Sequence, residues 1–224
     1  MKNMPSIEQS TIEFLYDLSR HNDRLWFAEN RPRYEKAREN YALFVQAVID
    51  ETVGFDPILK GLEAKSCMFR INRDTRFSRD KSVYKINFGA FIVRGGKKNG
   101  DKFPGYYLHI EPGASFVAGG AYIPPTPWLG AIRDRISESG EELTAIINSR
   151  EYTKYFSGLE GERLKIPPRG YSKEDPHIEL IKMKSFLAER QFTDDEVVAL
   201  VFFEVVTGAF RAIKPLSDFL NSAR

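Results

Sequence analysis

Three stretches in the middle of the chain alternate apolar and polar residues, and this two-residue period predicts β-strands. The stretches cover about residues 67–72, 85–92 and 106–111, and residues 115–122 are expected to form a fourth strand. The glycine-rich segment 95–100 and the Pro112-Gly113 pair separate the later stretches and are typical of turns. Strands that follow one another through short turns form an antiparallel meander. We therefore predict a central antiparallel sheet.

Helical periodicity dominates the N-terminal part of the chain. Ser6 and Gln9 have the spacing of a capping box, which opens a predicted helix over 6–19. The Asn22-Asp23 pair offers a cap for a second helical segment. A longer helix is expected over about 32–54, because a proline opens it and apolar residues recur there with the helical period.

The C-terminal part also reads as helical. Helices are predicted around 129–136, 143–147, 176–189 and 193–213. Thr193 and Glu196 fit a second capping box, and Pro215 is expected to stop the last helix. Helices at both ends and strands between them predict an α+β fold, a central antiparallel meander with N- and C-terminal helices packed on one face.

Composition fits one domain, residues 1–224. Of these residues, 42% are hydrophobic and 29% are charged, which is ordinary globular usage, and a chain of this length can bury a core without disulfides. Cys67 is the only cysteine, so neither an internal disulfide nor a cysteine-based metal site is expected. We expect a cytoplasmic protein without a membrane span, because no signal-peptide run or long apolar stretch is present.

The positive charge is concentrated in one segment. The net charge is only +2, yet residues 65–102 hold 11 Lys and Arg against three Asp and Glu. The rest of the chain holds the other 22 basic and 28 acidic residues. A basic segment on an acidic body creates a local field that attracts anions.

The densest part of this segment is residues 70–85, here called the basic ribbon, with six cations in sixteen residues. Arginine binds phosphate or carboxylate through paired hydrogen bonds. The expected ligand-binding residues are Arg70, Asn72, Arg73, Arg76, Lys81, Tyr84, Lys85 and Tyr107. Of these, Tyr84 and Tyr107 would stack on the ligand or donate a hydrogen bond to it. The alternative is that Asp74 and Asp80 neutralise the arginines and the ribbon is a solvated hairpin.

Strand parity adds a second line of argument. It places Arg70, Asn72, Lys85, Asn87, His109 and Glu111 on one face, and Phe69, Ile71, Phe88, Leu108 and Ile110 on the core face. A polar face is either the wet side of an antiparallel sheet or the floor of a pocket. His109 is the candidate acid–base residue, because Glu111 would share its face. The three histidines lack the spacing of a metal site, and no cofactor-binding motif is present.

The residues from Arg70 to Lys85 resemble the signature of the domain of unknown function 2461 family. Further resemblance lies in Trp26-Phe27, 106–110, 119–122 and 168–171, so it covers nearly the whole chain. His21 and Val83 depart from the family pattern, in which an Asn and a Pro are expected. The resemblance implies a single-domain protein without an established activity, and it makes the basic ribbon a family feature.

Two classes of function stay open. The first is binding of a small phosphate- or carboxylate-bearing ligand through the basic ribbon and the polar sheet face, with or without catalysis. The second is an interaction module that docks an acidic partner. Nucleic-acid binding is a weaker alternative, because the whole-chain charge is near neutral and no recognised binding motif is present. The sequence indicates no cofactor and no oligomeric state.

Overall fold

The computed structural model describes residues 5–74 and 82–223. Its strands are β1 (Phe88–Ile92), β2 (Gly105–Ile110), β3 (Ser115–Ala121) and β4 (Phe186–Phe192). The longer helices are α1 (Gln9–Arg20), α3 (Arg31–Val53), α5 (Thr126–Ile147) and α9 (Phe202–Ser222). The shorter ones are α2 (Arg24–Glu29), α4 (Ala64–Cys67), α6 (Arg150–Thr153), α7 (Ile178–Ile181) and α8 (Asp194–Val198), with 3-10 turns η1 (Pro57–Leu59) and η2 (Lys97–Asn99).

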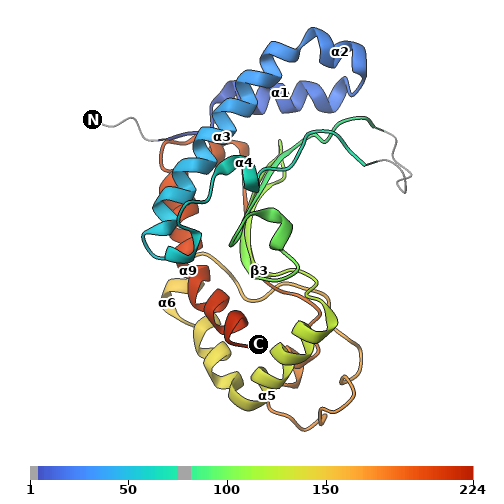
Figure 1. The fold of residues 1–224 in the computed structure, drawn as a ribbon, viewed down its shortest axis with the longest axis vertical. Coiled ribbons are helices and arrows are strands. Elements are labelled where there is room, and N and C mark those ends of the chain that lie inside the picture. The colour runs from blue at the N-terminus through green and yellow to red at the C-terminus, as the bar shows by residue number, and fades with distance from the viewer. Residues whose placement is uncertain (1–4, 75–81, 224) are drawn as a thin grey trace.

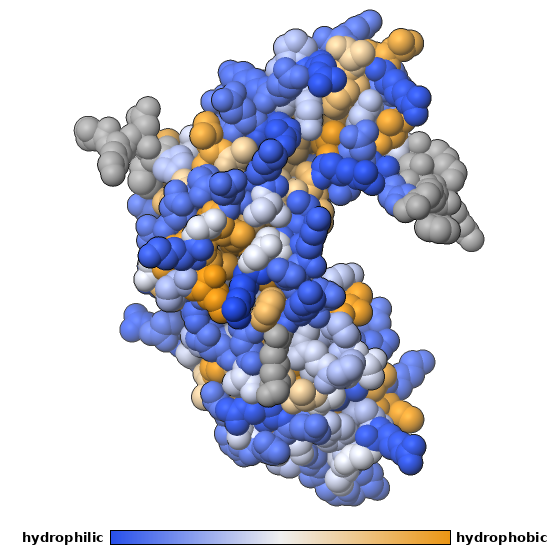
Figure 2. Space-filling view, in the orientation of Figure 1, coloured by the Kyte–Doolittle hydropathy of each residue, from blue (hydrophilic) through white to orange (hydrophobic). Residues whose placement is uncertain are grey.

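The strands pair as one antiparallel sheet in the order β1-β2-β3-β4. Helices α3 and α9 cover one face, and the other face, here called the open face, turns toward the hollow side of an arc-shaped molecule (Figure 1). Figure 2 shows that the surface beside this hollow is largely hydrophilic. The predicted α+β class is confirmed, with N- and C-terminal helices flanking the sheet.

The core lies between the sheet and the two covering helices. Ala90 and Leu108 face each other across β1 and β2, and both are fully buried. The hydroxyl of Tyr41 donates to the Leu108 carbonyl at 2.9 Å, and the Tyr41 ring stacks on Phe88. This bond satisfies a buried phenol and ties α3 to the middle of the sheet.

Two predicted helix starts are confirmed by their caps. The Asp23 carboxylate accepts hydrogen bonds from the backbone amides of Leu25 and Trp26, so it caps α2. Thr193 and Glu196 form the predicted reciprocal capping box, but it opens only the short α8, because the single helix predicted over 193–213 is divided into α8 and α9. Each cap satisfies backbone amides that the first helical turn leaves without a partner.

The predicted capping box of the first helix is wrong. Helix α1 begins at Gln9, and no side chain caps it. The side chain of Asn40, on α3, donates to the Ser6 carbonyl and accepts from the Glu8 amide. The segment before α1 is therefore held by a side chain of α3, and no local cap holds it.

Two predicted helix boundaries are also wrong. Helix α9 continues past Pro215 to Ser222, because Leu216, Phe219 and Leu220 are buried there. Their burial outweighs the roughly 3 kcal/mol that a proline inside a helix costs. Helix α5 joins the two predicted helices at 129–136 and 143–147, with a break at Ser139.

The helix predicted over 176–189 is wrong. Only α7 is helical there, and β4 takes the second half of the segment. Phe186 and Ala188 are fully buried, whereas the alternate residues Leu187 and Glu189 are only half-buried. This alternation fits a strand, and pairing with the distant β3 stabilises it.

The strand predicted over 67–72 is also corrected. The chain is helical up to Cys67, and single bridges then join Met68 to Ala90 and Asn72 to Tyr84. The alternation shifts at this junction, since Met68 is buried and Phe69 is 40% exposed. Phe69 therefore faces away from the core, contrary to the prediction.

Candidate functional site

A chain of hydrogen bonds crosses the open face of the sheet. Nδ1 of His109 lies 3.1 Å from the Tyr107 hydroxyl, and Nε2 lies 2.8 Å from the Glu111 carboxylate. Asn87, which precedes β1, donates to the same Glu111 oxygen at 3.3 Å. The predicted shared face of Asn87, His109 and Glu111 is confirmed.

Local structure fixes this chain in place. Residues two apart on β2 point to the same side, which aligns Tyr107 with His109. The His109 ring stacks on Phe116 of the neighbouring β3, with ring centroids 4.6 Å apart. The absence of a side chain at Gly89 makes room for Tyr107. A Cβ on Gly89 would lie only 2.6 Å from the Tyr107 hydroxyl.

The electrostatics keep the Tyr107 hydroxyl protonated. Burial, and then the Glu111 carboxylate, raise the pKa of Tyr107 to about 12. The Glu111 carboxylate accepts from Nε2–H of His109. In the neutral imidazole this leaves Nδ1 as the acceptor for the Tyr107 hydroxyl.

A cavity of about 740 Å³ lies between α3 and the start of the basic ribbon. Its lining residues are Arg31, Tyr34, Glu35, Arg38, Glu39, Met68, Phe69, Arg70, Ile71, Asn72, Lys85 and Lys97. Five of them are cations and two are carboxylates. Arg31 and Glu35 form an exposed ion pair at 2.9 Å, and positive charge remains in excess.

Lys85 lies close to other cations. Burial lowers the pKa of the Lys85 ammonium, and the neighbouring Arg70 and Arg73 guanidinium groups lower it further. The ammonium lies 5.2 Å from the centre of the Phe69 ring, and Phe69 in turn packs edge-on against Tyr107. The cavity and the hydrogen-bond chain of His109 are therefore neighbours, linked through one aromatic side chain.

The predicted ligand-binding residues fall into three groups. Arg70, Asn72 and Lys85 line the cavity together. Arg73 is half-buried and donates from Nη1 to the Ser82 hydroxyl at 2.8 Å. Arg76 and Lys81 lie outside the described residues.

The two predicted tyrosines take different positions. Tyr107 lies on the open face and contacts His109. Tyr84 is buried, and its ring stacks on Phe27 of α2 with centroids 4.0 Å apart. The Tyr84 ring therefore lies in the core and not in the cavity.

Helix α3 contributes side chains to the cavity that the prediction from the basic ribbon did not include. Arg31, Tyr34, Glu35 and Arg38 project from one side of this helix into the cavity. Their spacing of three and four residues places them on one helical face. That signal is present in the sequence, but only the packing of α3 against the ribbon joins the two sets of charges.

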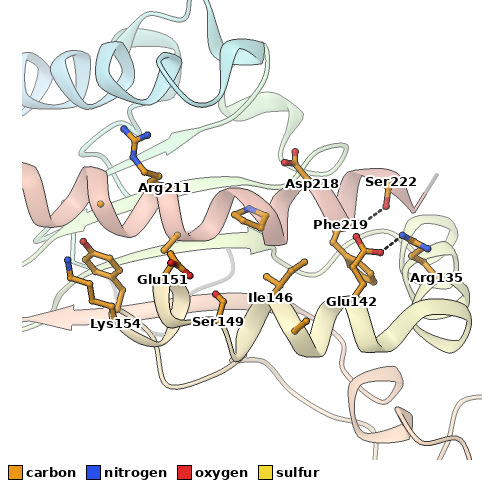
Figure 3. Close-up of a pocket in the computed structure, with 15 residues that line it drawn as sticks. Arg135, Glu142, Ile146, Ser149, Glu151, Lys154, Arg211, Asp218, Phe219 and Ser222 are labelled. Atoms are coloured by element: carbon orange, nitrogen blue, oxygen red, sulfur yellow. Dashed lines mark hydrogen bonds and ion pairs between the residues drawn. The ribbon is translucent and has the colours of Figure 1, made fainter.

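A larger cavity of about 1060 Å³ lies between α9 and the helices α5 and α6 (Figure 3). Ile146 and Phe219 form apolar parts of its wall, and charged side chains surround them. Arg135 pairs with Glu142, and Arg211 reaches Glu51 at 3.6 Å. Its charges are thus balanced, so we do not assign anion binding to it.

Within residues 5–74 and 82–223, no three His, Cys, Asp or Glu side chains gather as a metal ion would require. In the same part of the chain, no helix combines the length and the apolar character needed to cross a bilayer.

Comparison with known proteins gives a family and no activity. No curated protein and no solved structure matches the chain. A family model described as "Conserved hypothetical protein (DUF2461)" matches residues 10–219, which include the cavity and the hydrogen-bond chain. The protein therefore belongs to the DUF2461 family of conserved hypothetical proteins.

Proposed function

We propose that the protein binds a small phosphate- or carboxylate-bearing ligand in the cavity between α3 and the basic ribbon. One observation carries the proposal: Arg70 and Lys85 line the same cavity with three further cations and only two carboxylates, and the half-buried Lys85 ammonium has its pKa lowered by burial and by the neighbouring Arg70. Bringing like charges together in a sheltered position costs free energy. A bound anion would offset that cost.

The residues of the cavity suit an anionic group. The Arg70 guanidinium is exposed and can form paired hydrogen bonds to a planar carboxylate or a phosphate. Lys85 supplies a point charge, and the Asn72 amide supplies neutral donors. Phe69 gives the cavity an aromatic wall next to Lys85, so the organic part of a ligand also has a surface to contact.

A thermal-shift series tests this proposal. Phosphate and sulfate should raise the melting temperature above that in chloride at matched ionic strength. At an anion concentration of ten times Kd the stabilisation is about 1.4 kcal/mol, or roughly 3–5 °C for a domain of this size.

Variants locate the effect. Arg70→Ala and Lys85→Gln should abolish the extra stabilisation by phosphate. Arg169→Ala removes an exposed arginine that is far from the ribbon in the sequence. This variant should retain the extra stabilisation by phosphate. Equal melting temperatures in all three anions, or an unchanged phosphate effect in both cavity variants, would count against the proposal.

A further inference from the structure

Tyr107, His109 and Glu111 form a hydrogen-bonded series that has no part in the proposed anion binding. Both ring nitrogens of His109 are occupied, one by the Tyr107 hydroxyl and the other by the Glu111 carboxylate. The His109 side chain is only 12% exposed. His109 therefore has no free nitrogen for a ligand, and the hydrogen-bond chain ends at the Tyr107 hydroxyl, on a ring that packs against the cavity residue Phe69.

The arrangement has the three parts of a base-assisted nucleophile. A carboxylate orients an imidazole, the imidazole offers an unprotonated nitrogen, and a hydroxyl donates to that nitrogen. Here Glu111 orients His109, and Nδ1 of His109 faces the hydroxyl of Tyr107. The Phe116 ring holds the imidazole plane, and the Asn87 amide holds the carboxylate.

We propose that Tyr107 is a reactive hydroxyl whose proton is taken by His109, with Glu111 as the positioning carboxylate. This proposal goes beyond anion binding and holds whether or not the neighbouring cavity binds an anion. Tyr107 is the catalytic residue in this scheme, and His109 and Glu111 act through it.

The proton and the electron pairs balance in the reaction. The Tyr107 oxygen attacks an electrophilic centre, and a new bond from oxygen to that centre forms. The bond to the leaving group breaks, and the leaving group keeps the electron pair. The Tyr107 proton moves to Nδ1 of His109, which becomes an imidazolium paired with Glu111. That proton then passes to the leaving group or to water.

This chemistry selects a class of substrate. The substrate carries an activated acyl or phosphoryl group, because such groups accept a hydroxyl nucleophile and release a stable anion. The phenol of Tyr107 need not ionise beforehand. Transfer of its proton to His109 accompanies the attack, so the raised pKa of Tyr107 is compatible with the role.

An aryl sulfonyl fluoride tests the proposal without knowledge of the substrate. Attack by a tyrosine oxygen on sulfur releases fluoride and leaves a stable sulfonate ester, which peptide mass spectrometry locates. The labelling rate of Tyr107 is compared with that of Tyr122 in the same sample. Tyr122 is 66% exposed, so simple access favours Tyr122, and faster labelling of Tyr107 indicates activation.

Variants separate base assistance from access. His109→Gln should slow labelling of Tyr107 roughly 100-fold, which is a common contribution of a general base. Glu111→Gln keeps an acceptor for Nε2 of His109 and removes the charge, so it should give a smaller loss. Gln191→Ala changes an exposed residue of β4 and should leave both labelling rates unchanged.

The outcomes distinguish the possibilities. The proposal is overturned if Tyr107 is labelled no faster than Tyr122 in the unaltered protein. It is also overturned if His109→Gln and Glu111→Gln both fold and label Tyr107 at the original rate. Should His109→Gln unfold, Glu111→Gln decides, with the Tyr122 rate as the internal standard. Failure of this test leaves the phosphate-dependent melting temperature untouched, so the two proposals stand or fall separately.

Discussion

The side-chain amide of Asn22 makes two hydrogen bonds to the backbone of Tyr84, as a neighbouring strand would. Its oxygen accepts from the Tyr84 amide at 2.9 Å, and its nitrogen donates to the Tyr84 carbonyl at 3.0 Å. Beneath this pair, the Tyr84 ring stacks on Phe27. Asn22 therefore joins the turn between α1 and α2 to the basic ribbon, 62 residues away in the sequence.

Asn22→Ala should destabilise the protein by about 1–3 kcal/mol, because it leaves two part-buried backbone groups without their partners. Urea unfolding gives the change in free energy. Asn22→Asp keeps the acceptor and loses the donor, so its loss should be intermediate. Asn148→Ala removes an exposed amide that donates to the nearby Thr144 carbonyl of α5 and should change stability by less than about 0.5 kcal/mol. If Asn22→Ala changed stability as little as this control, the proposed role of the Asn22 side chain would be contradicted.

Tyr107 should make the folded state less stable at alkaline pH. The pKa of Tyr107 is raised from 10.0 to about 12 in the folded protein, chiefly by burial. A raised folded-state pKa means that the folded state holds the proton more tightly than the unfolded state. The contribution of Tyr107 is therefore complete below pH 10 and is lost as the pH rises toward 12, by on the order of 2–3 kcal/mol.

Urea unfolding between about pH 9 and about pH 12 measures this loss. Tyr107→Phe should flatten the fall in the free energy of unfolding over that range, because it removes the titrating hydroxyl. Tyr122→Phe removes an exposed hydroxyl and should leave the fall unchanged. Identical pH profiles for the unaltered protein and Tyr107→Phe would disprove the assignment.

Gly89→Ala should disturb the Tyr107–His109 hydrogen bond. The new Cβ would stand 2.6 Å from the Tyr107 hydroxyl and 3.5 Å from the Phe69 ring. We expect a destabilisation of about 1–3 kcal/mol, as for other overpacked sites. Combining it with Tyr107→Phe removes the clashing oxygen, so the double variant should be more stable than the two separate losses predict.

Gly130→Ala is the matched control for that substitution. Gly130 lies in α5, and no neighbouring atom comes within 4 Å of the position of an added Cβ. The alanine should stabilise the protein by up to about 1 kcal/mol through helix propensity. Strict additivity of Gly89→Ala and Tyr107→Phe would show that the glycine does not serve to accommodate the hydroxyl.

Tyr106→Phe should cost more than Tyr152→Phe. The Tyr106 hydroxyl donates to the buried Asp56 carboxylate at 2.8 Å, and the Lys214 ammonium lies 3.9 Å from Asp56. The Tyr152 hydroxyl donates to a neutral carbonyl, that of Gly158. Hydrogen bonds to charged groups contribute about 1.5–3 kcal/mol and neutral ones about 1 kcal/mol. Equal losses in urea unfolding, or a larger loss for Tyr152→Phe, would contradict this ordering.

The sequence by itself determined the features that depend on neighbouring residues. The two-residue alternation located β1 and β2, and the Pro112-Gly113 turn located the start of β3. Asp23 and Thr193 identified helix starts because a cap bonds to amides only two or three positions away. The shared face of His109 and Glu111 followed from the same short-range parity.

Tertiary structure decided what depends on residues far apart in the chain. The segment at β4 is a strand because it pairs with β3. Its own sequence favoured a helix, so the strand depends on this distant partner. The Tyr84 ring entered the core because Phe27 and Asn22 hold it there. The cavity exists only where α3 packs beside the basic ribbon and brings Arg38 near Arg70. Sequence patterns record the period of one element, whereas burial and charge convergence arise from contacts between elements, which local periodicity does not encode.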